Sequence, residues 1–181
     1  SRAARYGLTL AYMENMEFNK AHETLAPLLE SEPNRIAYVV TKAEIYTQGN
    51  EPGMARDFLA RHMTINPDNH PLTMAYADAL IAARDHAEAL QVLEHHATTR
   101  PEDHDLWYLI AETQGLVGDV SKVHQARAEY FILVGDFRSA SEQLTYALRI
   151  ESEKSNNAPL IARLRQRSQE VEELGRGARD M

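Results

Sequence analysis

With 181 residues, no cysteine and a net charge of −8, the chain excludes several kinds of protein. The missing cysteines rule out disulfides, cysteine catalysis and zinc–thiolate sites. The acidic balance argues against general nucleic-acid binding, and no apolar run approaches the ~20 residues that cross a bilayer. We therefore expect neither a nucleic-acid partner nor direct insertion into a membrane.

Three prolines spaced 34 residues apart set the period of the chain. Each ends an apolar helical pattern, because proline lacks an N–H and restricts the residue before it. Small residues that let two helices approach closely, and large ones that fill the space between units, recur at the same spacing. The recurring slots are Pro33, Pro67 and Pro101; Thr9, Ala43, Ala77 and Ala111; Ala21, Ala55 and Ala89; Leu25, Leu59 and Leu93; and Tyr12, Tyr46 and Leu80.

A period of about 34 residues predicts a tetratricopeptide-repeat (TPR) array of stacked helix–turn–helix units, because one unit cannot bury its apolar face alone. The expected fold class is all-α, a right-handed α-α superhelix of about ten antiparallel helices with a C-terminal capping helix. We expect repeat units at about 2–35, 36–69, 70–103, 104–120 and 121–151, a linker and capping helix at 152–175, and a disordered tail at 176–181.

Apolar periodicity and turn residues also place the individual helices. Beyond the third unit the pattern shifts by half a period, so one helix closes the fourth unit and opens the fifth. Gly175 and Gly177 are expected to end the last helix. The expected helices lie at about 3–15, 18–31, 35–48, 52–65, 70–83, 86–98, 119–134 and 159–174.

The first helix of each unit should line an inner, concave groove. One slot on these helices forms an acidic stripe beside apolar and aromatic residues, which predicts a groove for an extended segment or a neighbouring domain of apolar and basic character. A solvated helix face is the alternative. A carboxylate-bearing chaperone tail would be repelled. The predicted partner-binding residues are Tyr6, Leu10, Met13, Val40, Glu44, Met74, Asp78, Tyr108, Glu112 and Glu129.

No catalytic, metal or cofactor site is predicted within the chain. His62 and His96 occupy equivalent slots, but no pair of histidines shares one helix face with a carboxylate, so helix-end and inter-unit positions explain them. Serines such as Ser121 and Ser139 stand where a hydroxyl caps a helix. Trp107 is expected in the core of the fourth unit.

The last helix carries basic residues early and acidic ones late, against the helix dipole. Its basic residues are Arg163, Arg165 and Arg167, and its acidic residues are Glu170, Glu172 and Glu173. A solvated face explains this order, and pairing with the acidic surface of another domain is the alternative.

The end of the array supports a narrower resemblance. The run Gln125-Ala126-Arg127-Ala128-Glu129-Tyr130-Phe131, the turn Gly135-Asp136-Phe137, the segments Glu142-Gln143-Leu144 and Ala147-Leu148-Arg149, and a final basic helix ending in Glu-Glu-Leu together carry it. In these features the chain resembles the C-terminal TPR domain of periplasmic zinc metallopeptidases of the β-barrel assembly-enhancing type.

This resemblance implies a periplasmic location in a Gram-negative bacterium and a role in recruitment. The TPR domain would contact its own N-terminal protease domain, the outer-membrane β-barrel assembly machinery and β-barrel substrates, for chaperone-like assembly or degradation. The family's zinc would sit in an HExxH protease domain. This chain has no HExxH, since His22-Glu23 lacks the second histidine, so no cofactor is expected here.

The function predicted from the sequence is therefore that of a non-catalytic protein-interaction domain of such a metallopeptidase. The chain opens at Ser1 without a methionine and already inside a helical pattern, so we expect it to be a piece of a longer protein. A free-standing TPR scaffold of another bacterial assembly or secretion complex is the alternative.

Overall fold

The computed structural model describes residues 1–154 and 157–179, and these residues form ten α-helices and no strand. The chain is all-α, as the sequence predicts. The helices are α1 (Arg2–Glu14), α2 (Phe18–Ser31), α3 (Ile36–Gln48), α4 (Pro52–Met63), α5 (His70–Ala82), α6 (His86–Thr99), α7 (His104–Val117), α8 (Val120–Leu133), α9 (Phe137–Lys154) and α10 (Ala158–Arg179).

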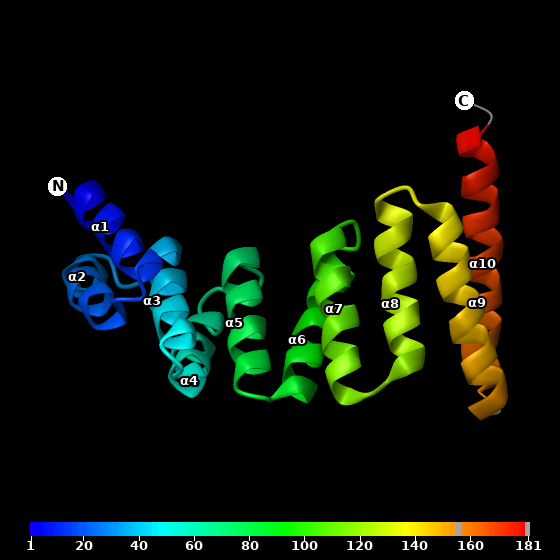
Figure 1. Cartoon of the computed structure of the whole chain (residues 1–181), viewed down its shortest axis with the longest axis horizontal. Coiled ribbons are helices and arrows are strands. Elements are labelled where there is room, and N and C mark those ends of the chain that lie inside the picture. Colours follow the sequence, from blue (N-terminus) through cyan, green and yellow to red (C-terminus); the bar gives the residue numbers. More distant parts are fainter. Residues whose placement is uncertain (155–156, 180–181) are drawn as a thin grey trace. The chain divides into compact units, whose positions relative to one another are not determined.

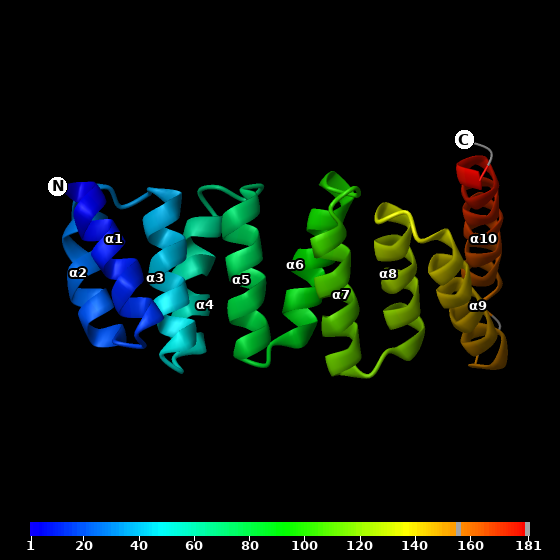
Figure 2. The ribbon, with the colours of Figure 1, turned by 45° about the horizontal axis from the view of Figure 1, so that its top comes forward.

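The helices group into two compact units, Ser1–Val92 and Leu93–Met181. In the first unit α1 packs against α2, α3 against α4, and α3 also against α5. In the second unit α8 packs against both α7 and α9, and α9 packs against α10. Helices that follow one another in each unit run in opposite directions, joined by short turns (Figures 1 and 2).

The backbone of the turns repeats with the period found in the sequence. Met16, Asn50, Arg84 and Gly118, which lie 34 residues apart, all have a positive φ, between 59° and 78°. Each follows the first helix of a pair and reverses the chain through the left-handed region. Gly135 has a φ of 79° half a period later, after α8. The turns thus show the same half-period shift as the side-chain pattern.

The repeating small and large slots are buried. Ala21, Ala55 and Ala89 have no exposed surface, and neither do Leu25, Leu59 and Leu93. In the first unit these side chains belong to two clusters, one around Leu25 and Ile45 and the other around Leu59 and Leu72. In the second unit α8, α9 and α10 share a cluster that includes Leu144, Leu164 and Val171. The small-residue slots therefore let the helices approach, as expected.

The last helix is longer than predicted. α10 continues through Gly175 and Gly177 to Arg179, so neither glycine ends it, and residues 176–179 are helical rather than a disordered tail. A Cβ at residue 175 would lie 3.3 Å from the Cβ of Phe137, so Gly175 allows α10 to approach α9 closely. The predicted tail residues 180–181 lie outside the described residues.

Two further expectations need correction. α9 runs to Lys154, so the linker does not begin at residue 152; residues 155–156 lie outside the described part. Trp107 is half-buried rather than central to the core, and its indole N–H donates a hydrogen bond of 2.9 Å to the Pro101 carbonyl oxygen. In the part of the chain that the structure describes, no helix combines the length and hydrophobicity of a membrane-spanning segment.

Candidate protein-interaction surface

In the first unit, the predicted groove residues come from α1, α3 and α5 and differ in their exposure. Leu10 is 38% exposed, whereas Met13 is only 8% exposed and belongs to the core cluster around Leu25. Val40 and Met74 are half-buried. Met13 therefore packs mainly in the core, and its place in the groove stays a prediction.

Tyr6 belongs to the packing of α1 on α3. Its hydroxyl shares a hydrogen bond of 2.9 Å with the Thr41 hydroxyl, and its ring lies 5.2 Å from the ring of Tyr38. The Tyr6 side chain remains half-buried. It fixes the first helix against the second repeat while leaving part of its ring at the surface.

Glu44 and Asp78 are the acidic residues of this face, and both reach solvent. Desolvation by the surrounding protein nevertheless raises the pKa of Asp78 above its ordinary value. Desolvation also raises the pKa of Glu44, and the nearby charge of Asp78 raises it further.

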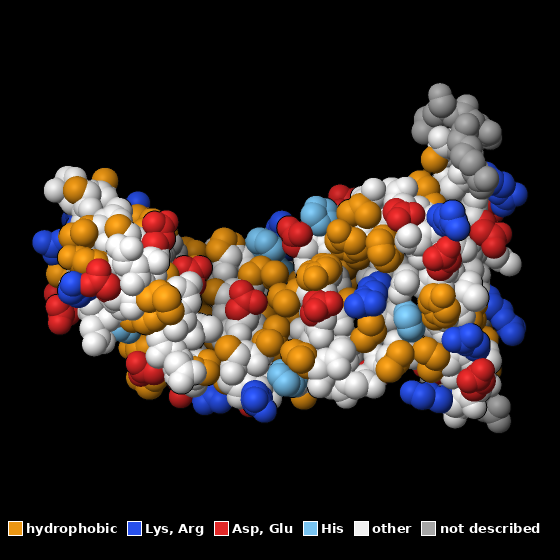
Figure 3. Space-filling model, in the orientation of Figure 1, with side chains coloured by type: hydrophobic (Ala, Val, Ile, Leu, Met, Phe, Trp, Pro, Cys, Tyr) orange, Lys and Arg blue, Asp and Glu red, His pale blue; other side chains and the backbone are white. Residues whose placement is uncertain are grey.

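In the part of the chain that the structure describes, no Lys or Arg forms an ion pair with Glu44 or Asp78. The groups that shift the two pKa values include no Lys or Arg among the described residues. In the face that Figure 3 shows, the surface over α5 is dominated by hydrophobic and acidic side chains. The α3–α5 face therefore presents two uncompensated carboxylates beside apolar groups such as Val40 and Met74.

In the second unit, Tyr108 and Glu112 lie on the side of α7 that faces α8. Tyr108 is 54% exposed, and its ring lies 5.8 Å from that of Tyr130. Glu112 forms an ion pair of 3.7 Å with Arg127, and both side chains are about half exposed. Here the exposed Tyr108 and the half-buried Tyr130 lie beside a carboxylate that is paired with Arg127.

Glu129 does not share this surface. Its carboxylate accepts two hydrogen bonds from Arg167 of α10, at 2.9 Å and 2.6 Å. Arg167 also donates to Glu170, and this contact is the main reason that the pKa of Glu170 lies below its ordinary value. On α8, Arg127 and Tyr130 face α7's exposed side, whereas Glu129 points to α10. The half-period shift thus breaks the predicted acidic stripe at its last member.

The same contacts account for one basic and one acidic residue of the last helix, Arg167 and Glu170. Arg167 is satisfied from within the chain by Glu129 and Glu170, so at this position no other domain is needed to pair with it. Hydrogen bonds to both acids raise the pKa of Arg167 further above its usual range. The guanidinium therefore remains charged at any pH at which the protein is folded.

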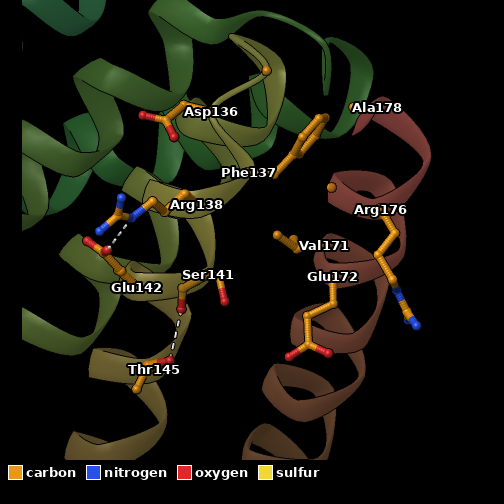
Figure 4. Close-up of a pocket in the computed structure, with 12 residues that line it drawn as sticks. Asp136, Phe137, Arg138, Ser141, Glu142, Thr145, Val171, Glu172, Arg176 and Ala178 are labelled. Carbon is orange, nitrogen blue, oxygen red and sulfur yellow. Dashed lines mark hydrogen bonds and ion pairs between the residues drawn. The ribbon is translucent and has the colours of Figure 1, made fainter. Parts of the chain in front are cut away.

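A large open hollow of about 860 Å³ lies between α9 and α10. Val171 points from α10 toward α9, Phe137 lies between the two helices, and Arg176 points away from α9 (Figure 4). On the α9 side, Arg138 pairs with Glu142 at 3.3 Å. The residues around this hollow form no arrangement of nucleophile, base and oxyanion donor.

Three of the histidines, His22, His62 and His96, take part in packing. The rings of His22 and Tyr46 lie 4.7 Å apart, and those of Phe58 and His62 lie 4.8 Å apart. His96 is 4% exposed. Among the described residues, no group of three His, Asp or Glu side chains is placed to hold a metal ion.

Sequence reasoning missed two features of these surfaces. The first is the aromatic line from His22 through Tyr46 and Phe58 to His62, which the spacing of aromatic residues along α2, α3 and α4 would have indicated. The second is a smaller hollow of about 370 Å³ beside α8. Its residues on α8 follow a helical i, i+3, i+4, i+7 spacing, which was visible in the sequence.

Comparisons with known proteins agree with this architecture. Residues 46–113 match the family model of the tetratricopeptide repeat. The β-barrel assembly-enhancing protease of Escherichia coli (strain K12) is 30% identical over 148 residues, which cover 81% of this chain and 30% of that protein. The protein of the same name from Shigella flexneri matches to the same extent. The chain thus spans 30% of the length of these curated relatives.

Solved structures with the same fold are more distant in sequence. MamA from Desulfovibrio magneticus RS-1, residues 41 to the end, has a TM-score of 0.64 and 13% identity, covering 95% of each chain. A thermophilic TPR protein of Thermus thermophilus has a TM-score of 0.58 and 16% identity, covering 94% of this chain and 98% of that one. The helix pairs, the turns that recur every 34 residues and these matches together show that the chain has the tetratricopeptide-repeat fold, a fold of protein–protein interaction domains.

Proposed function

We propose that this chain is the non-catalytic interaction domain of a periplasmic zinc metallopeptidase of the β-barrel assembly-enhancing type. In this role it recruits the outer-membrane β-barrel assembly machinery and β-barrel substrates, and it contacts its own protease domain. The 30% identity to the Escherichia coli protease supports the family. The motifs from Gln125 to Phe131 and at Gly135-Asp136-Phe137 are the parts of the sequence that most resemble this family. Zinc belongs to the protease domain, and this chain binds none.

The observation that carries the binding role is the uncompensated pair Glu44 and Asp78. Desolvation raises the pKa of both carboxylates, the charge of Asp78 raises that of Glu44 further, and a positively charged partner relieves this cost of ionisation. Half-buried Val40 and Met74 beside them offer apolar contact. The surface therefore suits an extended segment that alternates basic and apolar side chains.

Photo-crosslinking tests this proposal. A photoreactive residue replaces Leu10, which lies exposed on α1, in the protein expressed in its own Gram-negative host, and crosslinked partners are identified by mass spectrometry. Crosslinks to components of the β-barrel assembly machinery or to unfolded barrels are the expected result. A photoreactive residue at Glu30, an exposed position on α2, is the matched control and should not capture them.

A free-standing scaffold is the second candidate, and one observation favours it. The solved structures that resemble this chain include a TPR protein of Thermus thermophilus that is covered over 98% of the length of its solved chain, which supports a TPR array that acts without a protease domain. If the crosslinked partners belong to another assembly or secretion complex and none to barrel assembly, the scaffold role replaces the protease role.

A further inference from the structure

The smaller hollow of the second unit is built from converging helix faces. We call it the α8 hollow. Its volume is about 370 Å³, at the lower end of the ~300–1,000 Å³ of ligand sites. Several residues of each of α7, α8 and α10 line it, together with one residue of α6 and one of α9. The lining residues are Glu94; Trp107, Ile110 and Gln114; Lys122, Gln125, Ala126 and Glu129; Leu144; and Leu160, Arg163, Leu164 and Arg167.

The interior of the α8 hollow is apolar and rigid. Ile110, Leu144 and Leu164 are each at most 5% exposed, so their packing fixes the walls. The Trp107 ring is held at one side by the hydrogen bond from its indole N–H to the Pro101 carbonyl oxygen. Leu160 stands on the opposite helix, half-buried. An apolar side chain inserted here would displace water from surfaces that cannot hydrogen-bond to it.

The two carboxylates of the α8 hollow are already engaged. Glu129 is held by Arg167 through two hydrogen bonds. Glu94 accepts a hydrogen bond of 2.9 Å from the side-chain amide of Gln114. Gln114 is only 2% exposed. Among the described residues, neither carboxylate lies within ion-pair distance of the two remaining cations.

Those two cations, Lys122 and Arg163, lie toward the same end of the hollow. Both α8 and α10 run opposite to α9 and are therefore parallel, with Glu129 opposite Arg167. Arg163 precedes Arg167 by one turn of α10, and Lys122 precedes Glu129 by about two turns of α8. Within the part of the chain that the structure describes, neither cation has a carboxylate at ion-pair distance. The hollow thus has a positive end in a chain of net charge −8.

We propose that the α8 hollow binds an acidic segment of a partner protein that carries one bulky apolar side chain. The apolar side chain enters between Trp107 and Leu160, and the flanking carboxylates pair with Lys122 and Arg163. Charge complementarity selects this occupant, because a basic segment would meet two unpaired cations. The site differs from the α3–α5 face in its unit and in the sign of its charge, so each can fail without the other.

The protein's own fluorescence provides the assay. Trp107 is the only tryptophan of the chain and lines the hollow, so its emission reports occupancy there and not at the α3–α5 face. The probe is a short peptide in which a central phenylalanine is flanked by aspartate and glutamate. Two matched peptides replace the acidic residues by lysine, or the phenylalanine by alanine. We expect a saturable change in emission with the first peptide alone.

Variants locate the binding at the two cations. Lys122→Glu and Arg163→Glu each change an exposed side chain, so the fold should persist. Each should weaken binding of the acidic peptide by about tenfold or more, as expected for loss and reversal of a pairing charge. Arg165→Glu, on the same helix and exposed but outside the hollow, is the matched control and should bind like the wild type.

A salt titration of the wild-type protein tests the same point without any substitution. Binding of the acidic peptide should weaken as ionic strength rises, because salt screens charges at an open rim. The proposal is overturned if the emission of Trp107 does not saturate, if the lysine peptide binds equally well, or if Arg165→Glu loses as much affinity as Arg163→Glu. A change in emission that follows protein concentration instead of peptide would mean that a second copy occupies the hollow, and would also overturn it.

Discussion

At the scale of the residue, the turns between paired helices show how one backbone requirement is met by different side chains. The left-handed position is occupied by Met16, Asn50, Arg84 and Gly118 in turn. Only glycine adopts this conformation without steric cost, while asparagine is tolerated and the long side chains are strained there. The repeat therefore retains the turn geometry even where the residue type opposes it.

This leads to opposite effects for the same chemical change at two glycines. A Cβ at Gly118 or at Gly7 meets no heavy atom within 4 Å, so neither substitution creates a clash. Gly118→Ala should lower the free energy of unfolding by about 1 kcal/mol because φ is positive there. Gly7→Ala, inside α1, should raise it by up to about 1 kcal/mol. Urea unfolding measures both, and equal signs would contradict the assignment of the turn.

The strain at Arg84 gives the converse prediction. Arg84→Gly should raise the free energy of unfolding by a few tenths to about 1 kcal/mol, because glycine relieves the positive φ of 65°. Thermal denaturation of Arg84→Gly beside Arg84→Ala separates strain from the loss of the side chain, since alanine keeps the strained backbone. A stabilisation equal in both variants would assign the effect to the side chain instead.

Packed histidines determine how stability depends on pH. Desolvation lowers the pKa of His22, and so does Lys42, whose ammonium lies 2.9 Å from the ring nitrogen, whereas Glu51 raises it. Desolvation and Arg61 lower the pKa of His62. Both folded-state values thus lie below the ordinary 6.5. The stability that these two neutral histidines contribute is fully present above pH 6.5. It is lost as the pH falls toward their folded-state pKa values, because the histidines of the unfolded chain bind protons first.

Urea midpoints measured from neutral pH down to about pH 5 should therefore fall, and His22→Gln with His62→Gln should flatten the decline. His95→Gln, at an exposed position, is the control and should leave the slope unchanged. The raised pKa values of Glu44 and Asp78 act with the opposite sign and at more acidic pH, since they favour the folded state as those carboxylates become protonated. A midpoint that rises between neutral pH and pH 5 would contradict the account.

At the scale of the element, α10 is fixed to α8 by one partly buried ion pair and to α9 by apolar packing. The side chains of Arg167 and Glu129 are 33% and 24% exposed. Removing one member of such a pair leaves a desolvated charge behind, which costs more than the pair itself contributes. The position of α10 therefore depends on the ion pair between Arg167 and Glu129 of α8.

Glu129→Gln should therefore lower the free energy of unfolding by about 1–2 kcal/mol, a value reduced for the remaining exposure of the pair. Arg138→Gln breaks the pair with Glu142, whose side chains are 91% and 55% exposed, and should change stability by less than about 0.5 kcal/mol. Equal effects of the two substitutions would mean that α10 is held by its apolar face alone.

The elements also show how far the sequence could predict the structure. Periodicity and turn residues located α1 to α8 to within two residues at each end where ranges were predicted, because the repeated slots are the buried ones. They failed where the local pattern and the tertiary contact disagree. Glycine is typical of a helix end, but Gly175 lies inside α10 and allows close packing on Phe137. Met13 has the spacing of a groove residue, but its side chain packs mainly in the core. Glu129 could not be placed without knowing that α10 returns to α8.

At the scale of the whole molecule, the chain consists of helices that contact mainly their neighbours along the sequence. In such arrays stability is approximately a sum of repeat and nearest-neighbour terms. Leu25 belongs to the core of the first unit and Leu144 to that of the second, and both are at most 1% exposed. A substitution in one core should consequently loosen mainly its own unit.

Leu144→Ala should lower stability by about 2–5 kcal/mol, through lost burial and the cavity left behind. Hydrogen exchange should speed up in α8, α9 and α10 more than in α1 to α4. Leu25→Ala should produce the reverse distribution. Uniform acceleration along the chain in both variants would show that the two units unfold as one cooperative body.

The most direct test of the binding role is calorimetric titration of the protein with a urea-unfolded outer-membrane β-barrel protein diluted into buffer. Glu44→Gln with Asp78→Asn removes the two uncompensated charges, and Glu30→Gln removes one exposed charge elsewhere as the control. We predict that the double variant is at least as stable as the wild type, because desolvation no longer opposes a charge at either position, and that it binds about tenfold more weakly, while the control binds normally. Unchanged affinity in a folded double variant would contradict the proposal that the α3–α5 face binds protein.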